Sequence, residues 1–194
     1  YEEAKAMLFD WPGLQHAVIN LDDAMGVRLV QRLQGKQAQT GITGYTLSDK
    51  KIDGIAVLRA TDIRSNQSGT VFQLESAAGN TQVKTQLVGQ FNVSNVLGII
   101  GILLAKGVAL PDAVNAIEAL TAVPGRMQQL GGGEAPLVVI DYAHTPDALE
   151  KTLATLRSVA NDRGGELWCV FGCGGDRDPG KRPQMGKVAM AADH

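Results

Sequence analysis

Two short apolar runs, each followed directly by a polar loop, constrain the fold of this chain more than any other feature. The first run covers residues 136–140 and leads into a loop that begins at Asp141; the second covers 167–171 and leads into the glycine-rich loop 172–178. Short apolar runs that are bounded by turn residues and separated by a helical pattern are typical of buried parallel strands in a βαβ unit. Because ligands of open α/β sheets bind beyond the carboxyl ends of the strands, we expect both loops to line a site.

The overall composition excludes several classes of protein. The chain has 194 residues, of which 44% are hydrophobic and 5% aromatic, which fits a globular protein of one large domain or two small ones. A net charge of −2 gives no basic footprint for nucleic acid, and no apolar run approaches the roughly 18 residues that span a bilayer. Cys169 and Cys173 are too few for a structural zinc site or a disulfide framework. We therefore expect free thiols, a cytoplasmic location, and neither nucleic acid nor membrane as partner.

The spacing of apolar and turn residues predicts a succession of helices and strands. We expect helices at residues 2–9, 23–34, 92–106, 111–120, 146–160 and 183–193. We expect strands at residues 16–21, 53–61, 69–75, 82–87, 136–140 and 166–171, with a hairpin joining the third and fourth. Thr145 is expected to cap its helix with Pro146 at the first helical position, and Pro183 to occupy the first position of the last helix.

A break in this pattern predicts where one domain ends and the next begins. Pro124-Gly125-Arg126 interrupts the helical pattern, and we place a domain boundary near residues 122–126. Both ends of the chain fall inside helical patterns, so we expect it to be part of a longer protein.

The glycine-rich loop 172–178 matches neither of the common phosphate-binding fingerprints. Arg177 stands where the dinucleotide motif requires its third glycine, and no Gly-Lys-Ser/Thr follows at the spacing of a P-loop. A guanidinium binds a carboxylate through paired hydrogen bonds, so a loop that carries Arg177 between Asp176 and Asp178 suits a zwitterionic or carboxylate-bearing ligand. A solvated loop whose charges pair with one another is the alternative.

Polar residues elsewhere in the pattern admit a functional and a structural interpretation. Asp141 follows an apolar strand and could accept from a ribose hydroxyl or hold a metal-bound water, or it could cap a turn. His144 could contact a phosphate or transfer a proton, or it could be an ordinary exposed histidine. Asn92 and Asn95, spaced i, i+3 on one helix face, could match the edge of adenine with their amides, or one could be an N-cap. By composition alone, Lys5 is an ordinary surface lysine.

Five segments occur in an order and at separations that resemble the Mur ligases, and together they cover essentially the whole chain. They are residues 1–5, 89–95, 124–127, 141–149 and 168–185. The resemblance implies an α/β fold in which residues 1–123 are the C-terminal portion of a central ATPase domain. Residues 124–194 would be the N-terminal portion of a Rossmann-like C-terminal domain.

The resemblance also implies an activity, namely ATP-dependent amide formation in peptidoglycan precursor synthesis. ATP would phosphorylate the D-glutamyl γ-carboxylate of UDP-N-acetylmuramoyl-L-alanyl-D-glutamate, and the amine of meso-diaminopimelate or L-lysine would attack the acyl phosphate. The loop 172–178 favours this tripeptide-forming branch, and diaminopimelate over lysine. The P-loop of the family is absent from the sequence, so we expect the chain alone to be inactive. The resemblance also leads us to expect a monomeric full-length enzyme.

The resemblance assigns nucleotide contacts to five residues. Asn92 and Asn95 match asparagines that contact adenine, and Arg126 matches an interdomain arginine on the ATP phosphates. Asp141 matches the carboxylate on the ribose, and His144 lies in the segment that faces the nucleotide.

Two further residues match positions that serve the metal and the amino acid. Lys5 matches a lysine that is carbamylated, and its carbamate would ligate or orient Mg²⁺. Arg177 matches the arginine that holds the carboxylate of the incoming amino acid. The alternatives are a sister Mur ligase such as the one that adds D-Ala-D-Ala, a folylpolyglutamate synthetase, or a non-catalytic nucleotide-binding module.

Overall fold

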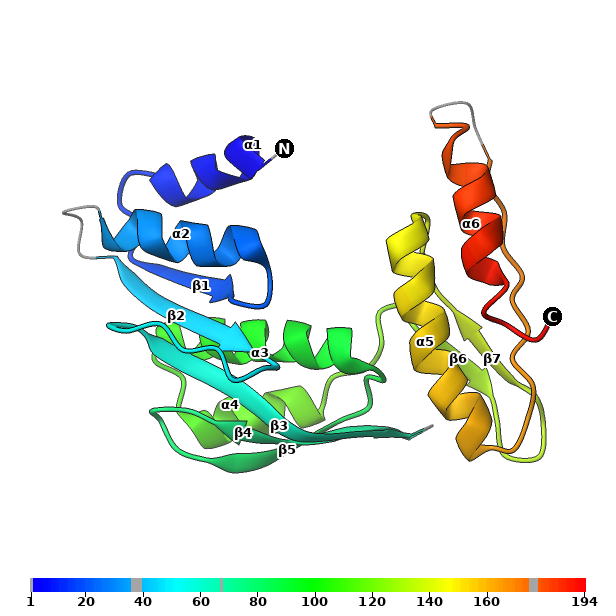
Figure 1. Ribbon diagram of the computed structural model, residues 1–194. Coiled ribbons are helices and arrows are strands. Elements are labelled where there is room, and N and C mark those ends of the chain that lie inside the picture. The colour runs from blue at the N-terminus through cyan, green and yellow to red at the C-terminus, as the bar shows by residue number, and fades with distance from the viewer. Residues whose placement is uncertain (1, 36–39, 67, 175–177) are drawn as a thin grey trace. The chain divides into compact units, whose positions relative to one another are not determined.

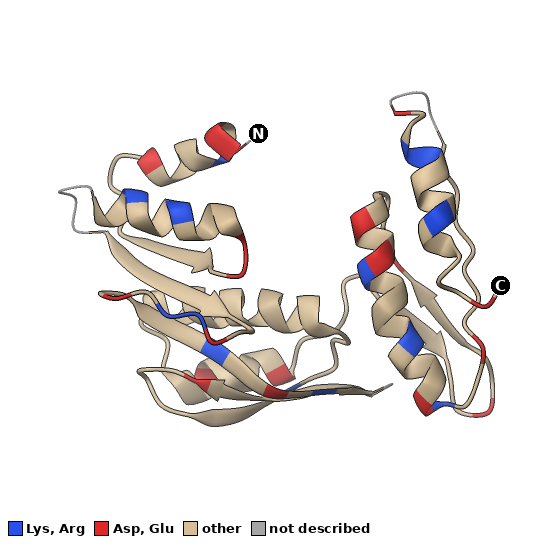
Figure 2. Ribbon diagram, in the orientation of Figure 1, with Lys and Arg blue, Asp and Glu red and all other residues tan. Residues whose placement is uncertain are grey.

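The computed structural model describes residues 2–35, 40–66, 68–174 and 178–194, and the chain divides into two compact units (Figure 1). The first unit comprises Tyr1–Arg64, Thr70–Thr85 and Gly89–Leu120, and the second comprises Ser65–Gly69, Gln86–Val88 and Thr121–His194. In each unit the described Lys and Arg residues are interspersed with Asp and Glu (Figure 2). Among the described helices, none has the length and apolar character needed to cross a bilayer.

The first unit is built on a five-stranded mixed sheet with the order β1-β2-β3-β4-β5. The strands are β1 (His16–Asn20), β2 (Gly41–Thr46), β3 (Ala56–Asn66), β4 (Gly69–Glu75) and β5 (Thr81–Thr85). β1 pairs with β2 and β2 with β3 in parallel, whereas β4 and β5 form an antiparallel hairpin. The predicted α/β class is confirmed, and so are the hairpin and the strands expected near residues 16–21 and 53–61.

β2 is a strand that the sequence pattern did not predict. Its sequence, Gly-Ile-Thr-Gly-Tyr-Thr, contains two glycines, which are depleted in strands. A Cβ added at Gly41 would lie 2.4 Å from Nδ1 of His16, and one added at Gly44 would lie 2.6 Å from Cδ1 of Leu21. The glycines that weaken the strand pattern are therefore required by the close packing around this interior strand.

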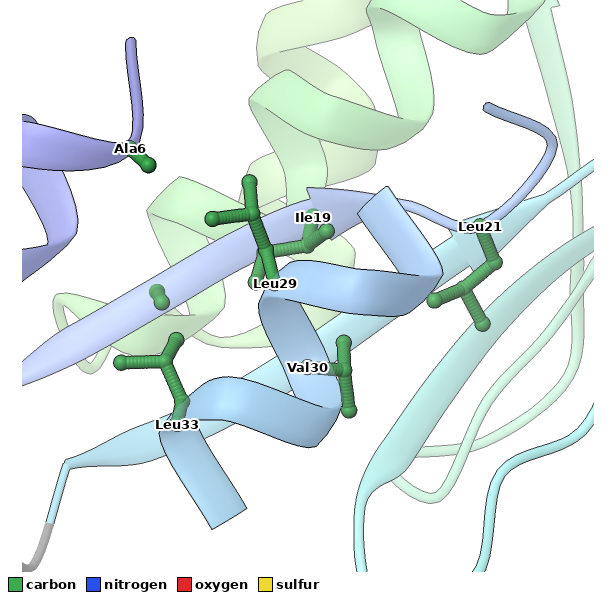
Figure 3. Close-up of a cluster of buried hydrophobic side chains, with 7 residues drawn as sticks. Ala6, Ile19, Leu21, Leu29, Val30 and Leu33 are labelled. Atoms are coloured by element: carbon green, nitrogen blue, oxygen red, sulfur yellow. The ribbon is translucent and has the colours of Figure 1, made fainter. Parts of the chain in front are cut away.

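Helices cover both faces of β1. The helices of the first unit are α1 (Glu2–Ala6), which continues as the 3₁₀ turn η1 (Met7–Asp10), α2 (Ala24–Gln34), α3 (Gln90–Ala105) and α4 (Leu110–Glu118). Ile19 and its neighbours on one face of β1 form a core with α2 that contains Leu29, Val30 and Leu33 (Figure 3). On the other face, Val18 lies against Gly101 of α3. The predicted helices at 23–34, 92–106 and 111–120 are confirmed.

The second unit combines a two-stranded hairpin with two helices. The strands β6 (Gln128–Gly131) and β7 (Leu137–Ile140) pair in antiparallel fashion, and the helices are α5 (Pro146–Asp162) and α6 (Lys181–Ala189). A small core of Leu149, Leu153, Leu167 and Met185 holds α5, α6 and the segment between them together. Thr145 caps α5 as predicted, since its Oγ1 accepts the backbone N–H of Ala148 at 3.2 Å.

Three predictions for the second unit are wrong. The run at 136–140 forms β7, but β7 pairs with β6, and residues 166–171 form no strand. The backbone N–H of Cys169 donates instead to the carbonyl of His194 at 2.8 Å, and the Val170 side chain is 97% exposed. An apolar run becomes a strand only where a neighbouring backbone pairs with it, and the pattern does not identify that neighbour. Pro183 is the third residue of α6 rather than its first, because the helix begins at Lys181.

Candidate functional site

The carboxylate of Asp141, just beyond the end of β7, joins three parts of the second unit. Its Oδ1 accepts from the backbone N–H of Ala143 at 2.9 Å and from the hydroxyl of Thr152 on α5 at 3.2 Å. Its Oδ2 accepts from the backbone N–H of Met127 at 3.0 Å. The turn-capping role that the sequence left open for Asp141 is therefore present. An ionised carboxylate has about four lone-pair positions, so these three donors leave room for a further hydroxyl.

The bond to Met127 shapes the turn that carries Arg126. In this turn the backbone N–H of Arg126 donates to the carbonyl of Val123 at 2.9 Å, and that of Gly125 to Oε1 of Gln128 at 3.0 Å. Gly125 has φ +74° and Met127 has φ +48°, a region that non-glycine residues rarely occupy. Met127 nevertheless buries its side chain, with 4% exposed. The turn is thus held at both ends, and Arg126 is an exposed residue at its centre.

The side chains of Arg126, Tyr142 and His144 form a continuous exposed series. The guanidinium carbon of Arg126 lies 4.9 Å from the centroid of the Tyr142 ring, a cation–π distance. The rings of Tyr142 and His144 have centroids 5.4 Å apart, and Nδ1 of His144 lies 3.1 Å from the carbonyl oxygen of Tyr142. When Nδ1 carries the proton that is donated to this carbonyl, Nε2 is left for a ligand. We call Arg126, Asp141, Tyr142 and His144 the Asp141 cluster.

Three predicted site residues, Arg126, Asp141 and His144, thus meet in this cluster. Sequence reasoning gave no separate role to Met127, Tyr142 or Thr152. Tyr142 lies between two candidates in the sequence, which could have drawn attention to it. No pattern in the sequence links Thr152 or Met127 to Asp141, because both contacts depend on the fold.

Asn92 and Asn95 lie together at the start of α3, in the first unit. Nδ2 of Asn95 donates to Oδ1 of Asn92 at 3.5 Å, so the two amides share one helix face, as the i, i+3 spacing predicted. The N-cap position of α3 belongs to Gly89, which excludes the alternative that either asparagine is the N-cap. Asn95 is exposed and Asn92 is half-buried.

The two remaining predicted site residues are Lys5 and Arg177. Lys5 lies on α1 and is exposed. Arg177 lies outside the described residues. At the described end of its loop, Oδ2 of Asp178 lies 3.9 Å from Nζ of Lys181, the first residue of α6.

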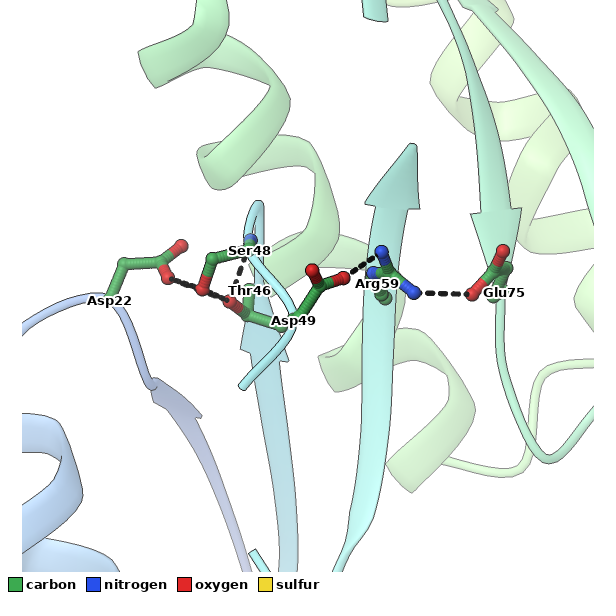
Figure 4. A network of polar contacts seen from close by, with 6 residues as sticks. All are labelled: Asp22, Thr46, Ser48, Asp49, Arg59 and Glu75. Atoms are coloured by element: carbon green, nitrogen blue, oxygen red, sulfur yellow. Dashed lines mark hydrogen bonds and ion pairs between the residues drawn. The ribbon is translucent and has the colours of Figure 1, made fainter. Parts of the chain in front are cut away.

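A second carboxylate network lies at the carboxyl ends of β1 and β2. The carboxylate of Asp22 accepts from the hydroxyls of Thr46 and Ser48 at 2.6 and 2.9 Å (Figure 4). It also accepts from the backbone N–H of Leu47 at 2.7 Å. Partial burial opposes ionisation, but these hydrogen bonds and the nearby charge of Lys50 outweigh it and lower the pKa of Asp22 below its usual value.

The residues described by the structure do not supply a complete metal site. Within residues 2–35, 40–66, 68–174 and 178–194, no three His, Cys, Asp or Glu side chains gather at a distance that could hold a metal ion. Asp23 is occupied as the N-cap of α2, where its Oδ1 accepts from the N–H of Met25 at 2.7 Å. Lys5, after carbamylation, is the only metal ligand that the sequence analysis predicted.

The second unit also contains an apolar groove of about 530 Å³. It is lined by β7, by the C-terminal half of α5 and by the segment 163–170, including Val138, Val159 and Trp168. None of the predicted site residues lines it.

Comparisons with known proteins give the same family for both parts of the chain. Residues 1–103 match the Mur ligase middle domain, and residues 125–194 match the Mur ligase glutamate ligase domain. Over all 194 residues the chain is 95% identical to the UDP-N-acetylmuramoyl-L-alanyl-D-glutamate–2,6-diaminopimelate ligase of Janthinobacterium sp. (strain Marseille), and it spans 38% of that relative. It is 52% identical over 191 residues to the ligase of the same name from Ralstonia nicotianae, covering 97% of this chain and 37% of that one. A solved structure of a ligase of this name matches with a TM-score of 0.73 and 40% identity, over 99% of this chain and 38% of the other.

Proposed function

The chain belongs to the Mur ligase family, and we propose that it is part of an ATP-dependent ligase that adds meso-diaminopimelate to UDP-N-acetylmuramoyl-L-alanyl-D-glutamate. The observation that carries the proposal is the 95% identity to the Janthinobacterium ligase, which extends along all 194 residues. Identity at this level favours this ligase over a sister Mur ligase, a folylpolyglutamate synthetase or a non-catalytic module. We propose diaminopimelate rather than lysine because the names of both curated relatives specify it.

We divide the chain between two domains of the full-length enzyme. Residues 1–123 would complete the central ATP-binding domain, and residues 124–194 would begin the Rossmann-like C-terminal domain. The chain has no Gly-Lys-Ser/Thr sequence of a P-loop, so we expect ATP-dependent ligation only from the full-length protein.

In the Asp141 cluster, Arg126 would bind the phosphates of ATP. Arg126 is an exposed residue, and its guanidinium carries donors suited to phosphate oxygens. Asp141 would accept from a ribose hydroxyl with the acceptor capacity that Ala143, Thr152 and Met127 leave unused. His144 would offer Nε2 to the nucleotide while Nδ1 donates to the carbonyl of Tyr142.

In the first unit, Asn92 and Asn95 would recognise adenine. A side-chain amide carries a donor and an acceptor, which complement the donor and acceptor on the adenine edge. Lys5 would react through its uncharged Nζ with carbon dioxide and lose a proton, so that a cation becomes a carbamate anion. When Mg²⁺ is bound it neutralises phosphate charge, and the Lys5 carbamate would ligate or orient it.

The proposed reaction has two steps. The γ-carboxylate of the D-glutamyl residue attacks the γ-phosphorus of ATP, and ADP leaves. The amine of diaminopimelate then attacks the acyl carbon, and the tetrahedral intermediate collapses with loss of phosphate and of the amine proton. Arg177 would hold the carboxylate of the incoming diaminopimelate through paired hydrogen bonds. We place the enzyme in the cytoplasm, where ATP is available, and expect a monomer.

A hybrid protein tests this function. In the hybrid ligase, the present 194 residues replace the matching segment of the Janthinobacterium ligase. The hybrid is incubated with ATP, Mg²⁺, UDP-N-acetylmuramoyl-L-alanyl-D-glutamate and either meso-diaminopimelate or L-lysine, and the product is identified by mass spectrometry. We expect the tripeptide with diaminopimelate, with one phosphate released per product.

The unmodified Janthinobacterium ligase serves as the control for the assay. If it is active while the hybrid forms no product, or if the hybrid prefers lysine, the proposed function is wrong.

A further inference from the structure

Arg126 lies at an exposed turn, where a long side chain loses conformational freedom when it binds a ligand. An arginine side chain has many rotamers, so ordering it costs more conformational entropy than ordering most other side chains. A neighbour that holds the guanidinium before the ligand arrives lowers that cost. The aromatic ring of Tyr142 is such a neighbour, since its centroid lies 4.9 Å from the guanidinium carbon of Arg126.

The backbones of both partners are fixed by the same carboxylate. Asp141 accepts from the N–H of Met127, the residue after Arg126, and from the N–H of Ala143, the residue after Tyr142. One carboxylate therefore holds both backbone segments from which the two side chains extend. Tyr142 is 65% exposed, so the ring is not retained here by burial in the core. Within the described part of the chain its hydroxyl makes no hydrogen bond, and its ring contacts the guanidinium of Arg126 and the ring of His144.

We propose that Tyr142 is a positioning residue that holds the guanidinium of Arg126 ready for the phosphates of the nucleotide. This inference rests on the proposed nucleotide contact of Arg126. If Tyr142 had only a structural role in the fold, its substitution would lower stability rather than ATP affinity. If its ring stacked directly on the base, it would contribute to ATP binding even when Arg126 is absent.

A double-mutant cycle in the hybrid ligase separates these roles, with the ATP dissociation constant measured by calorimetry. We expect Tyr142→Leu, which keeps an apolar side chain but removes the ring, to weaken ATP binding about fivefold. Tyr142→Phe, which keeps the ring, should restore the affinity. In an Arg126→Ala background, Tyr142→Leu should have no further effect.

Two further measurements complete the test. Trp168→Leu removes another exposed aromatic side chain of the second unit, one that stacks on His194, and should leave ATP binding unchanged. The ¹⁵N-arginine spectrum of the hybrid should contain an Arg126 Nε–H resonance shifted by the ring current of Tyr142. That shift should persist in Tyr142→Phe and vanish in Tyr142→Leu, with Arg126→Lys providing the assignment.

The results of these measurements either support or overturn the positioning role of Tyr142. Additive effects of Tyr142→Leu and Arg126→Ala on ATP binding, or an Arg126 resonance that Tyr142→Leu does not move, would overturn the positioning role. A lower melting temperature of Tyr142→Leu with unchanged ATP affinity would overturn it as well. A hybrid that shows the coupling in ATP binding but ligates no diaminopimelate would support the positioning role while contradicting the proposed reaction.

Discussion

The backbone N–H of Met127 donates to Oδ2 of Asp141 at 3.0 Å, across 14 positions of the chain. Met127 has φ +48°, and a non-glycine residue in this region costs about 1–3 kcal/mol. A hydrogen bond to a charged group contributes about 1.5–3 kcal/mol, so the carboxylate offsets the strain of the turn. One side chain thereby holds Arg126 in place and connects its turn to α5 through Thr152.

The first prediction concerns this carboxylate. In Asp141→Asn, an amide N–H₂ replaces one acceptor oxygen and opposes the N–H of Met127 or of Ala143. We expect the free energy of unfolding of the second unit to fall by about 1–3 kcal/mol. Urea unfolding of the 194-residue chain, followed by the fluorescence of Trp168 in a Trp11→Phe background, measures this change.

The matched control for this substitution is Asp147→Asn. Asp147 lies in the first turn of α5, is 74% exposed and pairs with Lys151 at 2.9 Å. An exposed ion pair of this kind contributes little to stability, so we expect the free energy of unfolding to change by no more than about 0.5 kcal/mol. Equal effects of the two substitutions would mean that Asp141 does not hold the turn.

The second prediction concerns the contact between α2 and the end of β1. A Cβ added at Gly26 would lie 1.8 Å from the backbone oxygen of Asn20, which cannot move without disturbing β1. Gly26→Ala should therefore destabilise the first unit by more than about 2 kcal/mol, although alanine favours a helix by about 1 kcal/mol over glycine. Trp11 fluorescence in a Trp168→Phe background reports on this unit.

Gly35→Ala, at the C-cap of the same helix, is the control. The added Cβ would lie 3.5 Å from the carbonyl oxygen of Gln31, an ordinary contact, and the residue has a right-handed backbone. We expect it to be neutral or slightly stabilising. A neutral Gly26→Ala would show that α2 can move away from Asn20.

The elements that the sequence predicted well are those specified by local chemistry. α2 begins after an aspartate cap and carries apolar residues at helical spacing, and α5 begins at Thr145 followed by proline. The β4–β5 hairpin has alternating residues around a turn that contains Gly79 and Asn80. Such signals lie within a few neighbouring residues and need no tertiary contact to be recognised.

The features that the sequence did not predict depend on partners far along the chain. β2 contains glycines because His16 and Leu21 approach it closely. Residues 167–171 are as apolar as β7, but their backbone bonds to residues near His194. The Asp141 cluster was predicted in part, since three of its residues were candidates, whereas the cation–π contact through Tyr142 was not.

The third prediction concerns Arg177 and depends on the proposed function. In the hybrid ligase, Arg177→Ala should raise the KM for diaminopimelate about 10- to 100-fold, because it removes charge-assisted hydrogen bonds to the substrate carboxylate. The KM for ATP should change far less. Lys187→Ala removes an exposed cation of α6 and controls for charge. Equal increases in both KM values would contradict a carboxylate-binding role.

The final prediction concerns the pH dependence of the first unit. The pKa of Asp22 lies below the usual aspartate value of 3.8, because the hydrogen bonds of Thr46, Leu47 and Ser48 outweigh the partial burial. A group with a lowered pKa in the folded state stabilises the protein above its unfolded pKa and loses that contribution as the pH falls through the folded pKa. Asp22 should therefore stabilise the first unit at neutral pH and cease to do so in acid.

Asp22→Asn tests this dependence, since asparagine resembles a protonated aspartate. At pH 7 we expect the variant to be less stable by about 1 kcal/mol, a modest value because the side chain is largely exposed. The difference in the free energy of unfolding between the two proteins should persist down to about pH 4. Below that pH it should vanish, because the native carboxylate becomes protonated. Glu118→Gln, an exposed carboxylate on α4, controls for the loss of one charge. A difference of constant size from pH 7 to pH 2, measured by urea unfolding with Trp11 fluorescence, would show that the network stabilises the fold without linkage to the charge of Asp22.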